Sequence, residues 1–229
     1  ASGSGRGITT FVTDGNEFPV SGIYDDGLHS TRGGARMQFS KASVILEQGW
    51  TSYTDESRLQ FNDGGHQGNR PNRLLGQELI LNQYSQPYRA TGEGLYQRGI
   101  LNASPWSFLT FSGQFLYSQP RLRIRQDAMA AGNFLRLETL LPFSNFAETV
   151  NSEAQMPHTS ASTAVEFRPV SRLRIIQSWF TDRFHIAGMA NISRQFASPG
   201  TTATELLSSP DRLVVNYNQH QVEALFDVT

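Results

Sequence analysis

The chain of 229 residues contains no cysteine. This absence excludes disulfides, thiolate metal ligands, cysteine nucleophiles and haem attached through a CxxCH motif. Charge is also scarce: charged residues make up 17% of the chain, Lys41 is the only lysine, and the formal net charge is −1. We therefore expect neither charge-driven disorder nor a nucleic-acid partner.

Long hydrophobic runs are missing as well. No run of about 18 apolar residues occurs, so no transmembrane helix is expected. The strands of a membrane β-barrel would escape such a search, because only every second residue in them is apolar. We expect residues 1–229 to form a single domain, with residues 1–16 as a flexible N-terminal segment.

Alternation with a period of two residues is common and long, whereas helical periodicity is scarce. Between Leu109 and Tyr117, the odd-numbered residues are apolar or glycine, and the even-numbered ones are polar apart from Leu116. Similar alternation runs through residues 88–101, 161–168 and 222–228. The best helical candidate, residues 126–138, is interrupted by Gly132. The sequence therefore predicts an all-β protein.

The spacing of the turns gives the architecture. Tight reversals at 40–43, 102–105 and 168–171 predict hairpins at about 31–53, 87–119 and 160–186. Long polar stretches follow the three hairpins, at 54–86, 120–159 and 187–210. Short turns alternating with long loops are typical of outer-membrane barrels. We predict an antiparallel up-and-down transmembrane β-barrel with short turns on one side and long loops on the other. The count of about eight strands leaves open whether the chain forms a complete barrel or part of a larger one.

In such a barrel apolar residues face lipid and polar residues face the lumen. We therefore expect six residues to point outward: Tyr96, Ile100, Leu109, Phe111, Phe115 and Tyr117. The residues predicted to face the lumen are Arg89, Glu93, Gln97, Thr110, Ser112, Gln114, Glu166 and Arg168. The tryptophans at 50, 106 and 179 are expected near the two membrane interfaces.

No motif predicts catalysis, a metal site or a cofactor. The five histidines have no HxH or HxxxH spacing, and no GxSxG motif occurs. Arg121, Arg123 and Arg125 alternate with Leu122 and Ile124. These arginines either form an anion-attracting ladder on a lumen wall or mark strand ends whose side chains bind lipid phosphates, and we favour the second interpretation.

Three segments resemble large bacterial outer-membrane β-barrels, in particular the porin-like barrels related to the sheath of porin–cytochrome complexes. They are YRATGEGLY at 88–96, PWSFLTFSGQFLYS at 105–118 and AVEFRPVSRLRI at 164–175. The resemblance covers residues 29–229 as a pattern, without an invariant motif. It implies a barrel that insulates a multihaem cytochrome across the outer membrane, and no functional residues are transferred from it.

The expected function is therefore a non-enzymatic barrel of the bacterial outer membrane, acting as a porin-like passage or as a sheath for a partner. Its expected partners are outer-membrane lipid and either another envelope protein or further copies of the chain. The alternative is a secreted or extracellular β-sandwich or jelly roll that binds carbohydrate or packs into a shell. That alternative predicts that Phe111, Phe115 and Tyr117 are buried against a second sheet.

Overall fold

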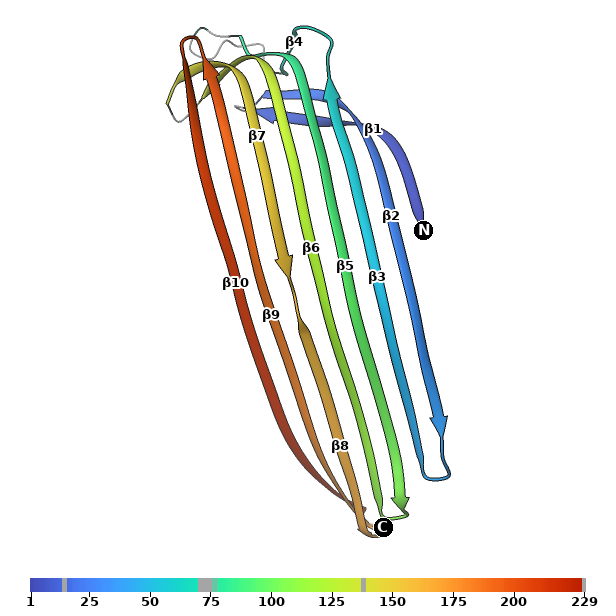
Figure 1. Cartoon of the computed structure of the whole chain (residues 1–229). Coiled ribbons are helices and arrows are strands. Elements are labelled where there is room, and N and C mark those ends of the chain that lie inside the picture. Colours follow the sequence, from blue (N-terminus) through green and yellow to red (C-terminus); the bar gives the residue numbers. More distant parts are fainter. Residues whose placement is uncertain (14–15, 70–75, 77, 137–138, 228–229) are drawn as a thin grey trace.

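The computed structural model describes residues 1–13, 16–69, 76, 78–136 and 139–227, and among these it contains strands and no helix (Figure 1). The strands are β1 (Ser2–Thr13), β2 (Asn16–Gln38), β3 (Ala42–Phe61), β4 (His66–Gln67), β5 (Ile80–Trp106), β6 (Leu109–Arg136), β7 (Leu141–Gln155), β8 (His158–Val170), β9 (Leu173–Ser198) and β10 (Thr201–Phe226). The prediction of an all-β, antiparallel, barrel-like fold is confirmed.

All the strands belong to one sheet, in the order β1-β2-β3-β5-β6-β7-β9-β10. The strands β7 and β8 both pair with β6 and β9, so they are consecutive stretches of a single position in the sheet. Pro157 lies between them and has no N–H to donate to a neighbouring strand, although its carbonyl still accepts the His185 N–H. The sheet thus has eight positions, in agreement with the predicted strand count.

The turns lie at two opposite ends of the sheet. The end that we call the turn end holds the connections 39–41, 107–108 and 171–172. The middle one differs from the prediction, because β5 continues through residues 102–105 to Trp106. The predicted long loops are corrected too: most of 120–159 and 187–210 is strand, and only the connection between β3 and β5, which contains β4, is long. The expected flexible segment 1–16 contributes β1, which pairs with β2.

The strands are long because their alternation continues past the apolar part of the sequence. Residues 126–136, which looked weakly helical, belong to β6. A register shift between Ala131 and Phe134 in the pairing with β7 breaks the period of two there. A bulge of this kind inserts an extra residue, which hides the strand pattern from a sequence analysis.

Register assigns every side chain to one of two faces, because directly paired residues share a face and neighbours along a strand alternate. One face carries the row Phe61, Tyr84, Ala130, Phe146 and Phe196, each paired with the next. We call it the hairpin face, because the β1–β2 hairpin packs on it. The opposite face carries the row Met37, Val44, Leu101, Gly113, Thr163 and Trp179, and we call it the belt face.

The tip of the β1–β2 hairpin turns across the sheet at the end opposite the turn end (Figure 1). Phe18 and Val20 are fully buried there, in a cluster with Leu81, Phe134 and other apolar side chains of the sheet. The ring of Phe11, which pairs with Phe18, stacks on Tyr84 at 4.3 Å. This cluster holds the hairpin against the sheet.

We predict that Phe18→Ala destabilises the packed hairpin by about 3–5 kcal/mol, because the substitution leaves a cavity in the one cluster that fixes it. Hydrogen exchange of the β1 and β2 amides measures the effect, and faster exchange is expected there while β9 stays protected. The matched control is Phe39→Ala in an exposed turn, which should leave exchange unchanged. Equal effects of the two substitutions would contradict this role for the cluster.

Candidate functional site

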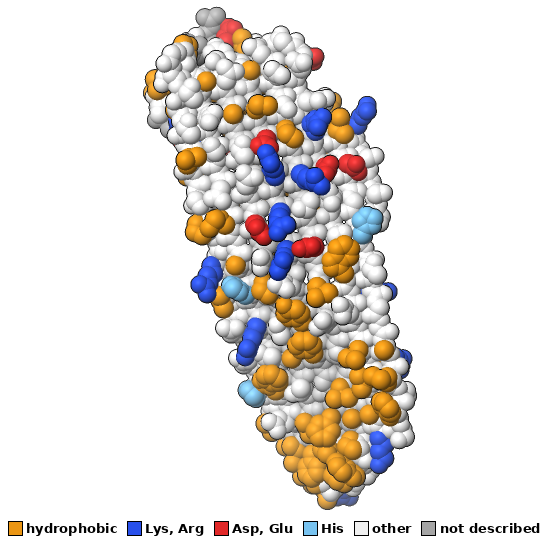
Figure 2. All heavy atoms as spheres, in the orientation of Figure 1, with side chains coloured by type: hydrophobic (Ala, Val, Ile, Leu, Met, Phe, Trp, Pro, Cys, Tyr) orange, Lys and Arg blue, Asp and Glu red, His pale blue; other side chains and the backbone are white. Residues whose placement is uncertain are grey.

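The belt face is apolar near the turn end. The side chains that form this apolar belt are Ala35, Met37, Val44, Leu46, Trp50, Leu101, Phe111, Phe115, Tyr117, Val165, Phe167, Ile175, Trp179, Val222 and Phe226. They form a continuous patch across the sheet, visible in the lower half of Figure 2. Phe111 is 38% exposed and Phe115 is 44% exposed, so this patch faces outward from the protein. On β6 it runs from Leu109 to Tyr117, which is nine residues.

Charged residues begin where the apolar belt ends. Along β6 the belt-face residues beyond Tyr117 are Gln119, Arg121, Arg123, Arg125 and Asp127. Figure 2 shows basic and acidic side chains together above the apolar patch. At the level of the belt itself, Arg183 is the one charged strand residue that the described register places on this face.

The hairpin face is polar at the level of the apolar belt. The strand residues with charged or imidazole side chains that the register places there are Arg32, Arg36, Glu47, Arg98, His158, Glu166, Arg174, Asp182 and Glu223. Several are paired: Tyr96 Oη donates to Glu47 Oε1 at 2.7 Å, and His158 Nε2 lies 2.5 Å from Asp182 Oδ1. The two faces of one sheet therefore differ sharply in polarity over the same length of strand.

The residues predicted to face a lumen do not share one face. Thr110, Ser112, Gln114 and Glu166 lie on the hairpin face, and Arg168 pairs with Glu166 there. Arg89, Glu93 and Gln97 lie on the belt face, because Gln97 pairs with Tyr117 and Glu93 pairs with Arg121. The prediction of a common face is wrong for these three residues.

The predicted outward residues need a matching correction. Tyr96 and Ile100 lie on the hairpin face, since Ile100 pairs with Gln114. The error arose because polarity was used to orient β5 as a whole. Arg89 and Glu93 lie beyond the apolar belt, where the belt face is itself polar, so polarity does not identify the face there.

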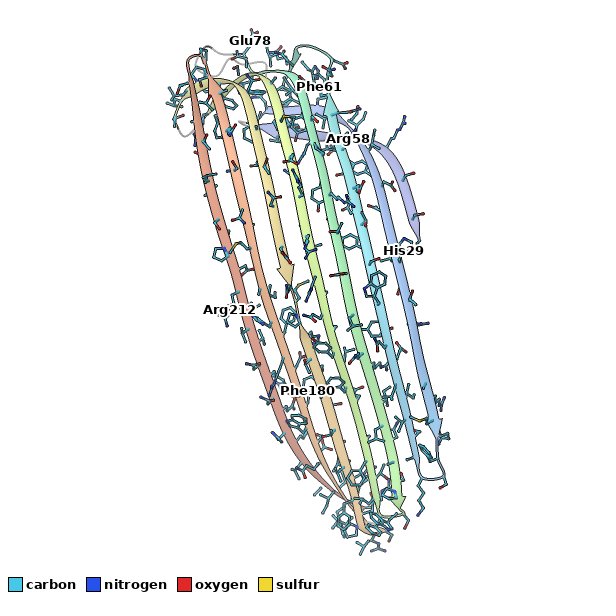
Figure 3. All side chains as sticks on the ribbon, in the orientation of Figure 1. His29, Arg58, Phe61, Glu78, Phe180 and Arg212 are labelled. Carbon is cyan, nitrogen blue, oxygen red and sulfur yellow. The ribbon has the colours of Figure 1, made fainter. Side chains whose placement is uncertain are left out.

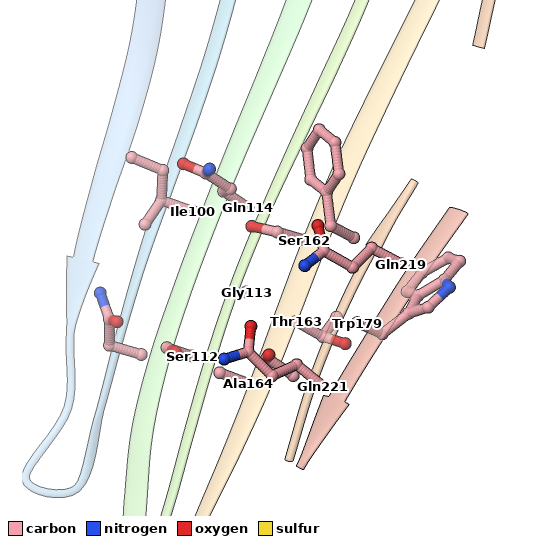
Figure 4. A pocket seen from close by; sticks show the side chains of 13 residues that line it. Ile100, Ser112, Gly113, Gln114, Ser162, Thr163, Ala164, Trp179, Gln219 and Gln221 are labelled. Atoms are coloured by element: carbon pink, nitrogen blue, oxygen red, sulfur yellow. The ribbon is translucent and has the colours of Figure 1, made fainter. Parts of the chain in front are cut away.

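A hollow of about 380 Å³ lies in the hairpin face near the turn end (Figure 4). The polar side chains that line it are Asn102, Ser112, Gln114, Ser162, Ser178, Gln219 and Gln221. Of the described residues that line it, none is charged. Phe180, labelled in Figure 3, adds an apolar ring. This wall offers hydroxyl and amide groups to water or to a neutral solute.

Two carboxylates oppose each other on the hairpin face beyond the belt. Asp26 pairs directly with Asp55 across β2 and β3. Partial burial, the Asp26 charge and a hydrogen bond with Asp26 all raise the pKa of Asp55 above its ordinary value. On the belt face, Asp127 accepts hydrogen bonds from Thr149 at 2.9 Å and Arg125 at 3.0 Å, and these lower its pKa.

Two negative findings concern the described part of the chain. It contains no group of three or more His, Cys, Asp or Glu side chains arranged to hold a metal ion. Nor does it contain a helix long and apolar enough to cross a membrane.

We predict that Asp55→Asn raises the free energy of unfolding at pH 7 by roughly 0.2–1 kcal/mol, because it removes one of two opposed like charges. A raised pKa means that ionised Asp55 is penalised in the folded state. The gain is therefore present above the folded-state pKa and disappears below the ordinary value of 3.8. Urea unfolding at pH 7 and pH 3 measures it.

The control with the opposite sign is Asp127→Asn. Its parent carboxylate has a lowered pKa, so the substitution should destabilise the protein at pH 7 and lose its effect as the pH falls. If Asp55→Asn destabilised the protein at pH 7, as Asp127→Asn should, the carboxylate pair would not be repulsive.

No family model matches the chain, and no curated protein matches it. The geometry of the two faces is therefore the basis for assigning a function.

Proposed function

We propose that the chain is a strand array of a bacterial outer-membrane β-barrel, which acts as a porin-like passage or as a sheath around a partner and has no catalytic role. The observation that carries this proposal is the inversion of polarity at the apolar belt. At this level the belt face is apolar and almost without charge, and the hairpin face carries arginines and carboxylates.

The height of the belt supports a membrane setting. A tilted strand of about 9–11 residues crosses a bilayer, and the apolar stretch of β6 from Leu109 to Tyr117 is nine residues. Trp50 and Tyr117 lie at the belt margin away from the turn end, and Trp106 lies at the margin near the turn end. The prediction for the third tryptophan is wrong, because Trp179 pairs with Thr163 in the middle of the belt. Interfacial aromatic girdles of this kind flank the apolar band of membrane barrels.

The strands β2, β3, β5, β6, β9 and β10 continue well beyond this height, and β7 continues the position of β8. The proposed barrel therefore projects from the membrane on the side opposite the turn end. The β1–β2 hairpin crosses the hairpin face in this projecting part. The Glu17 N–H donates to the side-chain Oδ1 of Asn69 at 3.1 Å, and the Asn69 N–H donates to the Glu17 carbonyl at 3.3 Å. In the proposed barrel this hairpin narrows the passage above the membrane.

The free edges of the sheet support a role for partner strands. No described residue pairs with the outer edge of β10, nor with the edge of residues 29–38 that faces away from β3. Unpaired backbone groups cost several kcal/mol each in hydrocarbon. In a membrane these edges therefore pair with strands of another envelope protein or of further copies.

Strand direction limits how that pairing occurs. Each antiparallel step reverses the direction of the chain, and the path β2-β3-β5-β6-β7-β9-β10 contains an even number of steps. The strands β2 and β10 therefore run in the same direction, toward the turn end. Direct contact between β10 and β2 of a neighbouring copy in the same membrane orientation would be parallel. An antiparallel barrel needs intervening strands that run away from the turn end.

The alternative of a soluble sandwich or jelly roll gains no support. It requires a second sheet over Phe111, Phe115 and Tyr117, and the described strands form one sheet that leaves these rings on an outward surface.

The test places the same charge on neighbouring residues of opposite faces. Phe115→Arg should cost about 2–4 kcal/mol of folding stability in lipid vesicles, because it puts a cation in the hydrocarbon. The adjacent substitution Gln114→Arg should cost little, because its side chain faces the polar wall. Urea titration of vesicle-folded protein, with heat-modifiable migration on a gel as the folding readout, measures both.

Equal tolerance of the two arginines would contradict the membrane assignment. A chain that folds as a soluble monomer without detergent would also contradict it.

A further inference from the structure

The hollow in the hairpin face (Figure 4) is lined by two adjacent rows of the sheet. The first row crosses from β5 to β10, each residue paired with the next, and consists of Ile100, Gln114, Ser162, Phe180 and Gln219. The second row lies two residues nearer the turn end and consists of Asn102, Ser112, Ala164, Ser178 and Gln221. Directly paired residues share a face, so both rows belong to one surface.

Both rows are neutral, whereas the rows of the hairpin face on either side of them carry charge. The next row away from the turn end contains Arg98 and Asp182. The next row toward the turn end contains Glu166 and Glu223. A charged solute in the hollow would lose hydration without gaining an ion pair from the described lining residues. The hollow therefore favours a neutral solute over an ion.

The two glutamines of β10 present complementary hydrogen-bonding groups. Tyr217 Oη donates to Gln219 Oε1 at 3.0 Å, which leaves the amide N–H groups of Gln219 as donors. Gln221 Nε2 donates to Glu223 Oε1, which leaves the side-chain oxygen of Gln221 as an acceptor. A hydroxyl group both donates and accepts hydrogen bonds. Neighbouring hydroxyls of one solute can therefore bind both glutamines.

Other polar side chains of the two rows also have free hydrogen-bonding capacity. Their side chains form no hydrogen bond with another described residue, and they are Asn102, Ser112, Gln114, Ser162 and Ser178. Each carries at least one donor and one acceptor. The hollow thus offers a series of neutral donors and acceptors rather than a single polar group.

Two aromatic rings lie beside these amides. Phe180 stands in the first row between Ser162 and Gln219, and its ring centroid lies 5.9 Å from that of Tyr217. Tyr217 is 48% exposed although it belongs to the polar hairpin face. A sugar ring has apolar C–H faces and hydroxyls at its edge. It can lay a face on these rings while the amides bind its hydroxyls, a combination of apolar wall and placed polar groups that fixes a ligand's orientation.

We propose that this hollow binds a neutral oligosaccharide. The inference rests on the proposed function, in which the hairpin face is the wall of a passage or sheath, and it names the class of solute. An elongated solute that lies across the strands meets the next strand of the rows about every 4.8 Å. This repetition favours a chain of sugar units over a single small polyol. A peptide would instead use the free edges of the sheet, where its backbone can pair.

The experiment is isothermal titration calorimetry of the full chain, folded in lauryldimethylamine oxide because this detergent has no sugar headgroup. The neutral probes are maltohexaose, xylohexaose and chitohexaose, and the anionic probe is hexagalacturonate. We expect saturable binding of at least one neutral hexasaccharide. Hexagalacturonate should bind more weakly, because its carboxylates find no cation among the described lining residues.

Substitutions in the two rows test the site itself. Gln219→Ala combined with Gln221→Ala should weaken binding by roughly 25-fold, because each lost hydrogen bond is worth about fivefold in affinity. Phe180→Leu keeps an apolar side chain but removes the flat ring, so it should weaken binding as well. The matched control is Gln177→Ala, which removes an exposed amide at the same level of the belt face and should leave binding unchanged. Heat-modifiable migration on a gel checks that each variant is folded.

The inference is overturned if none of the neutral hexasaccharides binds the folded parent protein, or if hexagalacturonate binds as tightly as they do. Parent-like affinity in either the glutamine double variant or Phe180→Leu would overturn it too. Each of these results leaves the proposed barrel intact, provided that the parent protein inserts into vesicles. Failure of the parent protein to insert would instead contradict the proposed function.

Discussion

The pairing of strands in one continuous sheet is the constraint on which the rest of this structure depends. Register ties the strands together, so the row Leu101, Gly113, Thr163 and Trp179 lies on one face and the adjacent row Ile100, Gln114, Ser162 and Phe180 lies on the other. A slip of one residue would exchange the faces of a whole strand. It would place aromatic rings against the polar wall and amides in the belt, which makes the observed register strongly preferred.

Side chains on the hairpin face reinforce this register. The ring of Tyr96 lies across Gly49 on the neighbouring strand, and the ring of Tyr53 lies across Gly92, so closely that a Cβ at either glycine would clash with the ring. Farther from the turn end, burial raises the pKa of Tyr84 to about 12, with the charge of Glu148 as a smaller cause. The same ring supports Phe11 of the hairpin. Close aromatic contacts therefore connect the wall of the sheet to the segment that crosses it.

Sequence alternation predicts the half of the sheet near the turn end well and the opposite half poorly. Residues 109–117 alternate cleanly because one face is apolar, so their strand and its exposed face could be predicted. Beyond Tyr117 the alternation continues with its polarity inverted, because Arg121, Arg123 and Arg125 lie on the belt face and Leu122 and Ile124 lie on the hairpin face. Polarity therefore does not identify the face there. Arg89, Glu93 and Gln97 were assigned to the wrong face for the same reason. The hairpin cluster was missed although the Asp-Gly dipeptide at 14–15, between alternating residues, is a hairpin signal.

The membrane assignment is tested most directly by the positions of successive β6 residues relative to lipid. Because the chain has no cysteine, single-cysteine variants at positions 109–125 can each carry one spin label. In vesicles, labels at odd positions from 109 to 117 should be accessible to oxygen and protected from a water-soluble nickel complex. Even positions should show the opposite preference, and the alternation in oxygen access should end beyond position 119. Labels at 111 and 115 that neither reagent reaches would instead mean that these rings are packed inside the protein, and would contradict the barrel.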